Sequence, residues 1–405
     1  MLDDFGQRIR DIILSEMDLS RELSDEEICD LIGSVVSREA RDRPMTIKDR
    51  AELERTIFNS LRKLDVLQEL VDDRDVTEIM VNGPNDIFYE KAGRIQRFKG
   101  HFSSEEKLED VIQQIVGRHN RVVNQASPIV DTRLSDGSRV NIVLNPISIG
   151  GSAVSIRKFP EHPMSMERLV EIEALSPEVA RLLQILTQAK YNIFISGGTG
   201  SGKTTFLNAL SQYIPDDERI ITIEDSAELQ LLGAKNIVRL ETRNANTDGV
   251  TPITIRDLIR TALRMRPDRI IVGECRGAEA LDMLQAMNTG HDGSLSTGHA
   301  NSPHDIISRI ETMVLQGQDF PLNAIRQQIA SGIDIIVQLG RLRDKSRRVL
   351  EVSEVDGFMD GEIVLHTLYR FEETDVLDSG RIQGFLKKAG TLCHTDKLMA
   401  AGLSV

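Results

Sequence analysis

Apolar residues recur at helical spacing over about the first 70 residues of the chain. Within this part, Ser24 stands three residues before Glu27, which is the pattern of a capping box at the start of a helix. A second amphipathic run extends from about Thr46 to Leu70. Because no catalytic pattern occurs here, residues 1–70 are predicted to form a helical region, either a docking module or a stabilising appendage.

From about Val76 the pattern changes to short β-rich runs separated by Asn-Gly-Pro and Ala-Gly turns, which predicts a meander of strands. A capped helical run follows, and two short apolar runs on either side of Asp136-Gly137 then predict a hairpin. One further strand completes a small α/β domain, predicted over residues 71–160. The two prolines in "PEHPMS" indicate a linker over residues 161–165.

From about Met166, helical patterns alternate with apolar strands, among them "YNIFIS", "RIITIE", "NIVRLE", "RIIVGE", "GSLSTGH" and "DIIVQL". This alternation predicts a mainly parallel sheet with helices on both faces. The last two strands, "RRVLEVSEV" and "GEIVLHTLYRF", are typical of an antiparallel edge. This domain is predicted over residues 166–371, and residues 372–405 form a tail without a clear pattern.

Composition limits the function classes. The 405 residues give room for two or three domains, and the net charge of −14 argues against a protein that coats nucleic acid. No run approaches the roughly 18 apolar residues of a membrane span, and the N-terminus lacks the layout of a secretory signal. We therefore expect a cytoplasmic protein, with docking on a membrane protein left open. The scattered cysteines, Cys29, Cys275 and Cys393, indicate a reducing compartment.

The segment "GGTGSGKTT" follows the strand "YNIFIS" and opens a helical run, so it matches the phosphate-loop pattern G-x-x-x-x-G-K-[ST] in its proper context. Glycines let the backbone wrap phosphates, and N–H groups at the helix start point at them. Lys203 is expected to reach the β- and γ-phosphates of ATP, and Thr204 to bind Mg²⁺. The predicted nucleotide-binding residues are Gly197, Gly198, Thr199, Gly200, Ser201, Gly202, Lys203, Thr204 and Thr205.

Carboxylates stand at the ends of two later strands. The strand "RIITIE" ends on Glu224, with Glu228 four residues further on, and "RIIVGE" ends on Glu274. Since ligands gather at the carboxyl ends of parallel strands, these acids suit a metal ion or an attacking water. Glu224 and Glu274 are alternative candidates for activating the water, and Glu228 and Glu274 join Thr204 as predicted metal ligands; solvated turn acids are the plain alternative.

Two histidines flank the short strand within "NTGHDGSLSTGHANS". A lone histidine is more often structural than catalytic, but two beside a strand that follows a phosphate loop suggest a functional role. His299, at the strand end, is predicted to sense the γ-phosphate. His291 is predicted as a further nucleotide contact, with a structural role as the alternative.

Arginines form two sets. The first lies on or beside strands of the small domain: Arg133, Arg139 and Arg157. The second follows one face of a helix at i, i+4 and i+8: Arg256, Arg260 and Arg264. An arginine delivered across a domain or subunit interface neutralises charge in the transition state of phosphoryl transfer. Surface salt bridges and a solvated helix face are the respective alternatives.

Together these elements resemble the type II/type IV secretion-system ATPase superfamily, most closely its CpaF-type branch, which powers tight-adherence (Flp) pili. The resemblance extends from about Leu61 to Tyr369. It is carried by segments such as "VTEIMVNGPNDIFYEKAGRI", "ISGGTGSGKTTFLNAL", "TIEDSAEL" and "LRMRPDRIIVGECRGAEALDMLQAMNTGHDGSLSTGHANSP". It implies an α/β fold with a RecA-like P-loop ATPase domain, preceded by a small α/β domain and the N-terminal helical region.

The resemblance also implies a function. It predicts a homohexameric motor that hydrolyses ATP with Mg²⁺ and passes the motion to an inner-membrane platform protein, on the cytoplasmic side, for pilus assembly or protein secretion. Arginines similar to Arg133, Arg139 and Arg157 approach the phosphates in relatives. Neither direct nucleic-acid binding nor zinc is expected. The conjugation branch of the superfamily is one alternative, and a nucleic-acid motor is another.

Overall fold

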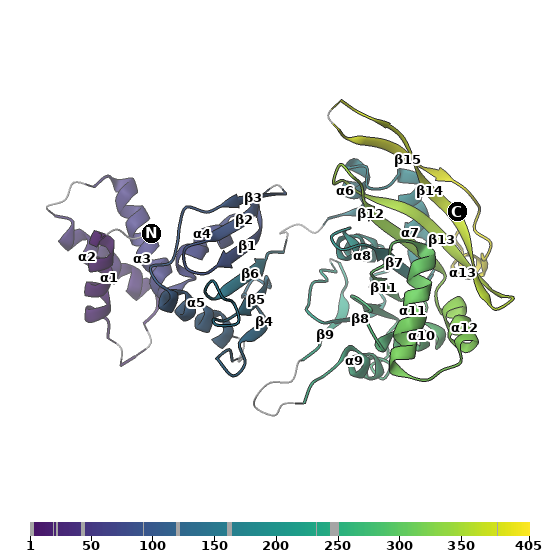
Figure 1. Cartoon of the computed structure of the whole chain (residues 1–405), viewed down its shortest axis with the longest axis horizontal. Helices are drawn as coiled ribbons and strands as arrows, with labels where there is room; N and C mark the ends of the chain where they lie inside the picture. The colour runs from purple at the N-terminus through teal and green to yellow at the C-terminus, as the bar shows by residue number, and fades with distance from the viewer. Residues whose placement is uncertain are drawn as a thin grey trace. The chain divides into compact units, whose positions relative to one another are not determined.

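The computed structural model of the chain describes residues 4–18, 20–21, 23–41, 45–91, 93–118, 122–159, 164–231, 233–243, 251–378 and 380–405. The chain divides into two units, Met1–Glu161 and His162–Val405 (Figure 1). Of the predicted linker, only Met164 and Ser165 fall within the described ranges. Across those ranges, no helix combines the length and the apolar character that crossing a bilayer requires.

Three helices open the first unit: α1 (Asp4–Glu16), α2 (Asp25–Glu39) and α3 (Ile47–Arg62). Ser24 and Glu27 form the predicted capping box of α2. The three helices enclose a small core of aliphatic side chains, namely Ile9, Ile13, Ile28, Ile32, Val35, Val36 and Ile57. Because α3 ends at Arg62, the amphipathic run expected up to Leu70 is divided into two parts.

The rest of the first unit is an antiparallel sheet in the order β3-β2-β1-β6-β5-β4. The strands are β1 (Val76–Asn82), β2 (Ile87–Lys91), β3 (Arg94–Arg97), β4 (Ile129–Arg133), β5 (Arg139–Val143) and β6 (Ala153–Arg157). Its apolar residues share a core with α5 (Glu105–Gly117), η1 (Asp65–Leu67) and α4 (Gln68–Asp72). The buried side chains of the segment after α3 belong to the core of this sheet and not to the core of the N-terminal helices. They are Leu64, Leu67 and Leu70.

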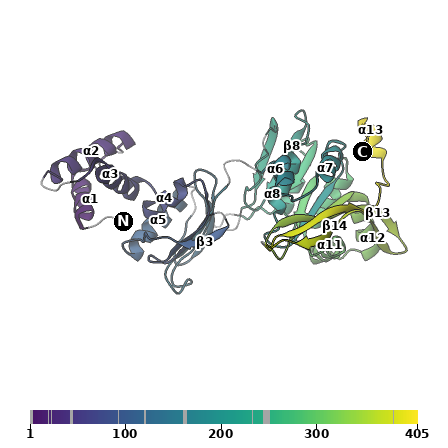
Figure 2. The ribbon, with the colours of Figure 1, turned by 90° about the horizontal axis from the view of Figure 1, so that it is seen from above.

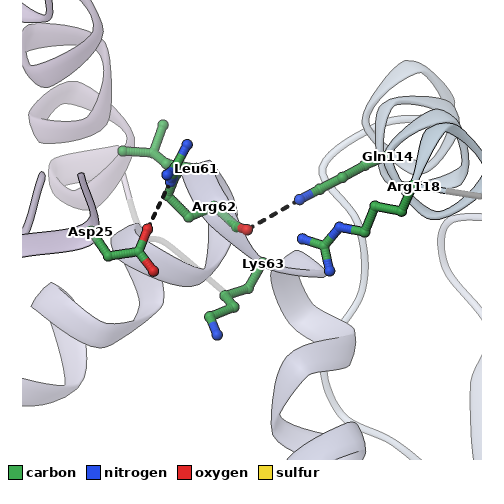
Figure 3. A pocket seen from close by; sticks show the side chains of 6 residues that line it. All are labelled: Asp25, Leu61, Arg62, Lys63, Gln114 and Arg118. Atoms are coloured by element: carbon green, nitrogen blue, oxygen red, sulfur yellow. Dashed lines mark hydrogen bonds and ion pairs between the residues drawn. The ribbon is translucent and has the colours of Figure 1, made fainter. Parts of the chain in front are cut away.

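Polar contacts join the two cores of the first unit where α3 ends beside α5 (Figure 3). Arg62 Nε donates to Asp25 at 2.9 Å, and Gln114 Nε2 donates to the Arg62 carbonyl at 3.1 Å. Lys63 and Arg118 line the same pocket and are the C-cap residues of α3 and α5. Positive charge is favourable at a helix C-terminus, so the helix dipoles account for this group of cations.

The second unit is built on nine strands in the order β15-β14-β13-β12-β7-β11-β10-β8-β9. The strands are β7 (Ile193–Gly197), β8 (Arg219–Glu224), β9 (Asn236–Glu241), β10 (Arg269–Val272), β11 (Leu295–Gly298), β12 (Ile335–Arg341), β13 (Arg347–Met359), β14 (Glu362–Val376) and β15 (Ile382–Lys388). The six strands from β12 to β9 are parallel, and β13, β14 and β15 extend the sheet in antiparallel pairing.

Helices cover both faces of this sheet, which confirms the predicted α/β class. One core holds α6 (Met166–Glu171), α7 (Pro177–Gln188), α8 (Lys203–Ser211) and α13 (Asp396–Ala401). The other holds α9 (Ile255–Ala262), α10 (Glu279–Asn288), α11 (Pro303–Gly317) and α12 (Leu322–Gly332). Figure 2 shows α6, α7 and α8 on one side and α11 and α12 on the other. Strands buried on both faces explain the continuous apolar runs in the sequence.

Residues after Glu372, which carry no clear pattern in the sequence, belong to the second sheet and its surroundings. The backbone N–H of His394 donates to the buried carboxylate of Glu354 at 2.8 Å. Lys397 Nζ lies 2.6 Å from Asp334 Oδ2. These partners lie 40 and 63 residues earlier in the chain, so local patterning cannot reveal that the C-terminal segment is held in place.

A buried ion pair supports the start of β10. The side chain of Arg269 is 0% exposed and forms two hydrogen bonds with Glu218, one of them at 3.1 Å. Its NH1 group donates to the carbonyls of Thr187 at 2.7 Å and Gly293 at 3.2 Å. A Cβ at Gly293 would come 2.5 Å from that same nitrogen, so the guanidinium leaves room only for glycine there.

Glu218→Ala is expected to lower the free energy of unfolding by about 3–5 kcal/mol, because it leaves a buried guanidinium without its counter-charge. Urea denaturation followed by circular dichroism measures the loss. The matched control is Glu171→Ala, since Glu171 pairs with Arg168 at 2.6 Å while both side chains are about 60% exposed. Exposed pairs contribute little, so the control should lose much less. Equal losses in the two variants would contradict the assignment.

Candidate active site

The phosphate loop connects β7 to α8, as the motif predicts. Gly200 has φ 71° and Gly202 has φ 94°, a left-handed backbone that favours glycine. At Gly197 a Cβ would lie 2.5 Å from Ser201 Oγ and 2.6 Å from the carbonyl of Leu339 on the adjacent strand β12. Backbone conformation explains two of the glycines, and the close approach of β12 explains the third.

Lys203 begins α8 and its side chain returns over the loop. Its Nζ donates to the carbonyls of Gly197 at 3.1 Å and Gly198 at 3.0 Å, and lies 3.3 Å from His299 Nδ1. Burial lowers the pKa of Lys203, and the nearby charge of Glu274 opposes that shift. The ammonium is thus held at the loop, where phosphates bind.

His299 and Glu274 meet beside Lys203 because β10, β11 and β7 are neighbours in a parallel arrangement, so their carboxyl ends lie at one edge. His299 Nε2 lies 2.9 Å from Glu274 Oε1. A neutral imidazole can accept from Lys203 at Nδ1, while its Nε2 lies against Glu274 Oε1, which itself accepts no hydrogen bond from the described residues. The pKa of His299 is lowered, first by burial and then by the charge of Lys203, which agrees with that neutral form.

An open pocket of about 260 Å³ borders the loop beside His299. Its lining residues are Gly198, Thr199, His299, Ala300, Asn301, Asp305 and Arg309. A phosphate bound by the first residues of the loop would therefore face His299.

Glu224 differs from Glu274 in its surroundings. Its carboxylate is buried and accepts hydrogen bonds from the backbone N–H groups of Glu228 and Leu229, both at 2.9 Å. A Cβ at Gly273 would lie 2.8 Å from Glu224 Cγ, so the glycine before Glu274 makes room for this side chain. Burial raises the pKa of Glu224 to about 7, against the opposing effect of the backbone hydrogen bonds. Glu224 holds the loop after β8 in place.

The raised pKa of Glu224 predicts a pH-dependent stability. The folded chain retains this proton up to about pH 7, whereas an unfolded glutamate loses it near pH 4.3, so stability is lost as pH rises through that window. In Glu224→Gln the side chain carries no charge, so the pH-dependent loss of stability disappears. Between pH 4.5 and 8 the variant should therefore gain roughly 3 kcal/mol relative to the wild type.

Urea unfolding of the wild type and Glu224→Gln at pH 5 and pH 8 measures this gain. Glu171→Gln, which changes an exposed carboxylate, is the control. A difference between wild type and Glu224→Gln that is the same at both pH values would contradict the raised pKa.

His291 is the predicted nucleotide contact that the structure corrects. Strand β11 runs parallel to β7, with Leu295 beside Ile193 and Gly298 beside Ser196. His291 precedes β11 and therefore lies toward the amino edge of the sheet, whereas the phosphate loop follows β7 at the carboxyl edge. With a rise of about 3.3 Å per residue, the strand itself separates them by more than about 10 Å.

The three arginines of the first unit stand in one row. Arg133 faces Arg139 across β4 and β5, and Arg139 faces Arg157 across β5 and β6. Asp131 Oδ1 lies 3.6 Å from Arg139 NH2. The row therefore brings three cations to directly opposed positions on adjacent strands. Their predicted contact with phosphates stays a prediction.

The arginine stripe on α9 has an internal role that the sequence does not reveal. Arg256 Nε lies 2.8 Å and Arg260 Nε 3.0 Å from the two carboxylate oxygens of Asp282, which is buried on α10. Arg264 follows the end of α9. Two of the three arginines thus bind one helix to the next.

The site suits an Mg²⁺ ion that is bound mainly by the phosphates of the nucleotide. Among the described residues, no group of three or more His, Cys, Asp or Glu side chains is placed to hold a metal ion. Mg²⁺ at nucleotide sites keeps several waters and takes its other ligands from phosphates and one or two protein oxygens. The Thr204 hydroxyl in the first turn of α8 suits that pattern. Metal binding by Glu228 and Glu274 remains a prediction.

Comparison with known proteins adds further findings. Residues 60–384 match the model of a family described as "Type II/IV secretion system protein". The chain is 32% identical over 322 residues to a putative conjugal transfer protein of Mycobacterium tuberculosis, covering 77% of this chain and 91% of that protein. It is 33% identical over 320 residues to the type IV secretion system protein PtlH of Bordetella pertussis, covering 73% of this chain and 94% of that protein.

The fold is shared by solved structures, among them a pilus motor. The pilus retraction motor PilT with bound ADP aligns with a TM-score of 0.55 at 23% sequence identity, covering 76% of this chain and 82% of that one. This likeness concerns the fold alone.

Proposed function

This chain belongs to the type II/IV secretion system protein family and is an ATPase, and from that premise we propose that it is the subunit of a hexameric motor. The superfamily expected from the sequence is confirmed. In the proposed function, ATP hydrolysis drives assembly of a tight-adherence pilus or secretion of protein. The motor acts on the cytoplasmic face of the inner membrane, through a platform protein. The CpaF-type branch remains a prediction.

The observation that carries this proposal is the chain of contacts from Lys203 through His299 to Glu274. It joins the cation of the phosphate loop to a carboxylate through one imidazole. Binding of a γ-phosphate beside Lys203 would compete for the contact with His299, so the presence of ATP is transmitted to Glu274. Mg²⁺, when bound, supplies charge neutralisation for the phosphates, with Thr204 contributing a hydroxyl.

The surroundings of the two glutamates favour Glu274 as the residue that positions or activates the water. The side chain of Glu274 is 19% exposed and lies beside the phosphate loop through His299. Glu224 is 4% exposed and its carboxylate is engaged by two backbone N–H groups. We therefore assign Glu224 to holding the loop after β8.

The row of Arg133, Arg139 and Arg157 supports a role in neutralising phosphate charge. Three cations in register on adjacent strands concentrate positive charge, which would attract an anionic ligand. We propose that the row approaches nucleotide bound by an ATPase domain of the ring. Hydrolysis would then depend on assembly.

The first experiment measures ATP turnover per subunit over a range of protein concentrations, together with the mass in solution. Turnover that rises with concentration alongside a hexameric mass supports a site completed by a neighbour. Concentration-independent turnover by a monomer would rule out the ring mechanism.

A second candidate function is transfer through a conjugation or type IV secretion apparatus. It is favoured by the relatives, which are named as a conjugal transfer protein and a type IV secretion protein. Deletion of the gene in its host separates the candidates, because loss of surface pili favours the first and loss of DNA or protein transfer the second. Hydrolysis stimulated by added DNA would instead indicate a nucleic-acid motor.

A further inference from the structure

Arg276, which has no role in the site described so far, lies against Glu274. Its NH2 group is 2.6 Å from Glu274 Oε2, the oxygen that His299 does not contact. Its NH1 group is 3.7 Å from Asp225 Oδ2, on the loop that follows β8. One guanidinium thus faces carboxylates that follow two adjacent strands.

The backbone around Arg276 is fixed independently of this contact. The N–H groups of Arg276 and Gly277 both donate to Glu279 Oε1, at 2.7 and 2.8 Å. Glu279 is the first residue of α10, so the turn between β10 and α10 is closed by its own helix. This turn directs the arginine side chain back toward the end of the strand from which it came.

Arg276 and Glu274 differ in how far their side chains are exposed to solvent. The side chain of Arg276 is 61% exposed, whereas that of Glu274 is 19% exposed. The pKa of Arg276 is raised, first by its hydrogen bond to Glu274 and also by the charges of Asp225 and Glu228. The guanidinium can therefore move without repacking the interior. It lies close to acidic side chains, including the Glu274 on which the proposed reaction depends.

We propose that Arg276 is a positioning residue for ATP hydrolysis, which orients the Glu274 carboxylate by holding Oε2 while His299 contacts Oε1. The inference rests on the proposed role of Glu274. A carboxylate held at both oxygens has one orientation, whereas a carboxylate held only by His299 can rotate about its last bond. Through Asp225, the same guanidinium keeps the loop after β8 in register with Glu274.

The consequence is a loss of rate without a loss of binding. A displacement of about 1 Å at a reacting group can cost about 100-fold in rate, so Arg276→Ala is expected to lower kcat about 10- to 100-fold. Lys203 and the loop glycines remain, so nucleotide affinity should change less than about threefold. Arg276→Lys should recover part of kcat, because an ammonium can reach one carboxylate but cannot bridge two.

The experiment compares wild type, Arg276→Ala, Arg276→Lys and Arg260→Ala in the full chain. It measures kcat, KM, equilibrium binding of a fluorescent ATP analogue, and Tm. Arg260 pairs with Asp282 on α10, and Asp282 keeps its second partner Arg256 in the variant, so Arg260→Ala should leave both kcat and Tm near those of the wild type. Arg276→Ala should lower kcat and leave Tm near that of the wild type, since an exposed ion pair adds little stability.

Three outcomes would overturn the proposal. One is a wild-type kcat in Arg276→Ala. The others are a lower kcat that is explained by weaker nucleotide binding, or one that is explained by a fall in Tm. The double variant Glu274→Gln/Arg276→Ala tests the route of action. If Arg276 acts through Glu274, the double variant is no slower than Glu274→Gln in single-turnover assays, and a further loss contradicts the proposal. Wild-type turnover in Glu274→Gln would instead refute the role of Glu274 itself.

Discussion

Lys203→Ala is expected to abolish steady-state ATP turnover, with a loss of at least about 100-fold. The variant removes the ammonium that binds the β- and γ-phosphates. The same ammonium stabilises the negative charge that develops in the transition state. In the structure this ammonium contacts Gly197, Gly198 and His299, which hold it at the phosphate loop. Phosphate release under saturating ATP measures the loss.

The fold should survive this change. Burial lowers the pKa of Lys203, which means that the interior disfavours its charge, so alanine removes an unfavourable group. Tm should accordingly stay near that of the wild type. The control is Lys235→Ala, because Lys235 pairs with Asp216 while 74% exposed and lies outside the site. Hydrolysis near the wild-type rate in Lys203→Ala would refute the phosphate-loop assignment.

Glu274→Gln is expected to lower kcat at least about 100-fold while nucleotide binding is retained. Glutamine keeps the shape of the side chain, but it lacks the negative charge that activates a water and pairs with Arg276. Steady-state turnover and equilibrium binding of a fluorescent ATP analogue together separate these effects.

Glu224→Gln is the matched comparison for Glu274→Gln. The Glu224 carboxylate accepts from two backbone N–H groups, and the amide oxygen of glutamine can accept from the same groups. Its loss of turnover should therefore be the smaller of the two. A larger loss in Glu224→Gln than in Glu274→Gln would reverse the assignment of the two glutamates.

Most of the fold could be predicted because it depends on short segments. The capping box at Ser24 and Glu27, the hairpin at Asp136-Gly137 and the apolar strands of the second unit each arise from residues close together in the chain. The C-terminal segment could not be predicted, because it is held by Glu354 and Asp334 and not by a pattern of its own.

The candidate site could be predicted only in part. The phosphate loop and the acids at strand ends follow from motif and position, but two histidines that flank one strand look equivalent in the sequence. Strand direction separates them, because one precedes β11 and the other follows it. Arg276 cannot be found from the sequence, because a single arginine in a turn carries no signal and its role depends on the placement of Glu274 and Asp225.

The sequence by itself determined that this chain carries a phosphate loop within an alternating α/β region, and to which superfamily it belongs, because both depend on residue type and local spacing. Only the tertiary structure decided that His299 joins Lys203, a residue 96 positions away. It also decided that Glu274 is contacted at both oxygens, and that three arginines stand in one row. These contacts depend on strand order and register, which are set by packing across the whole domain.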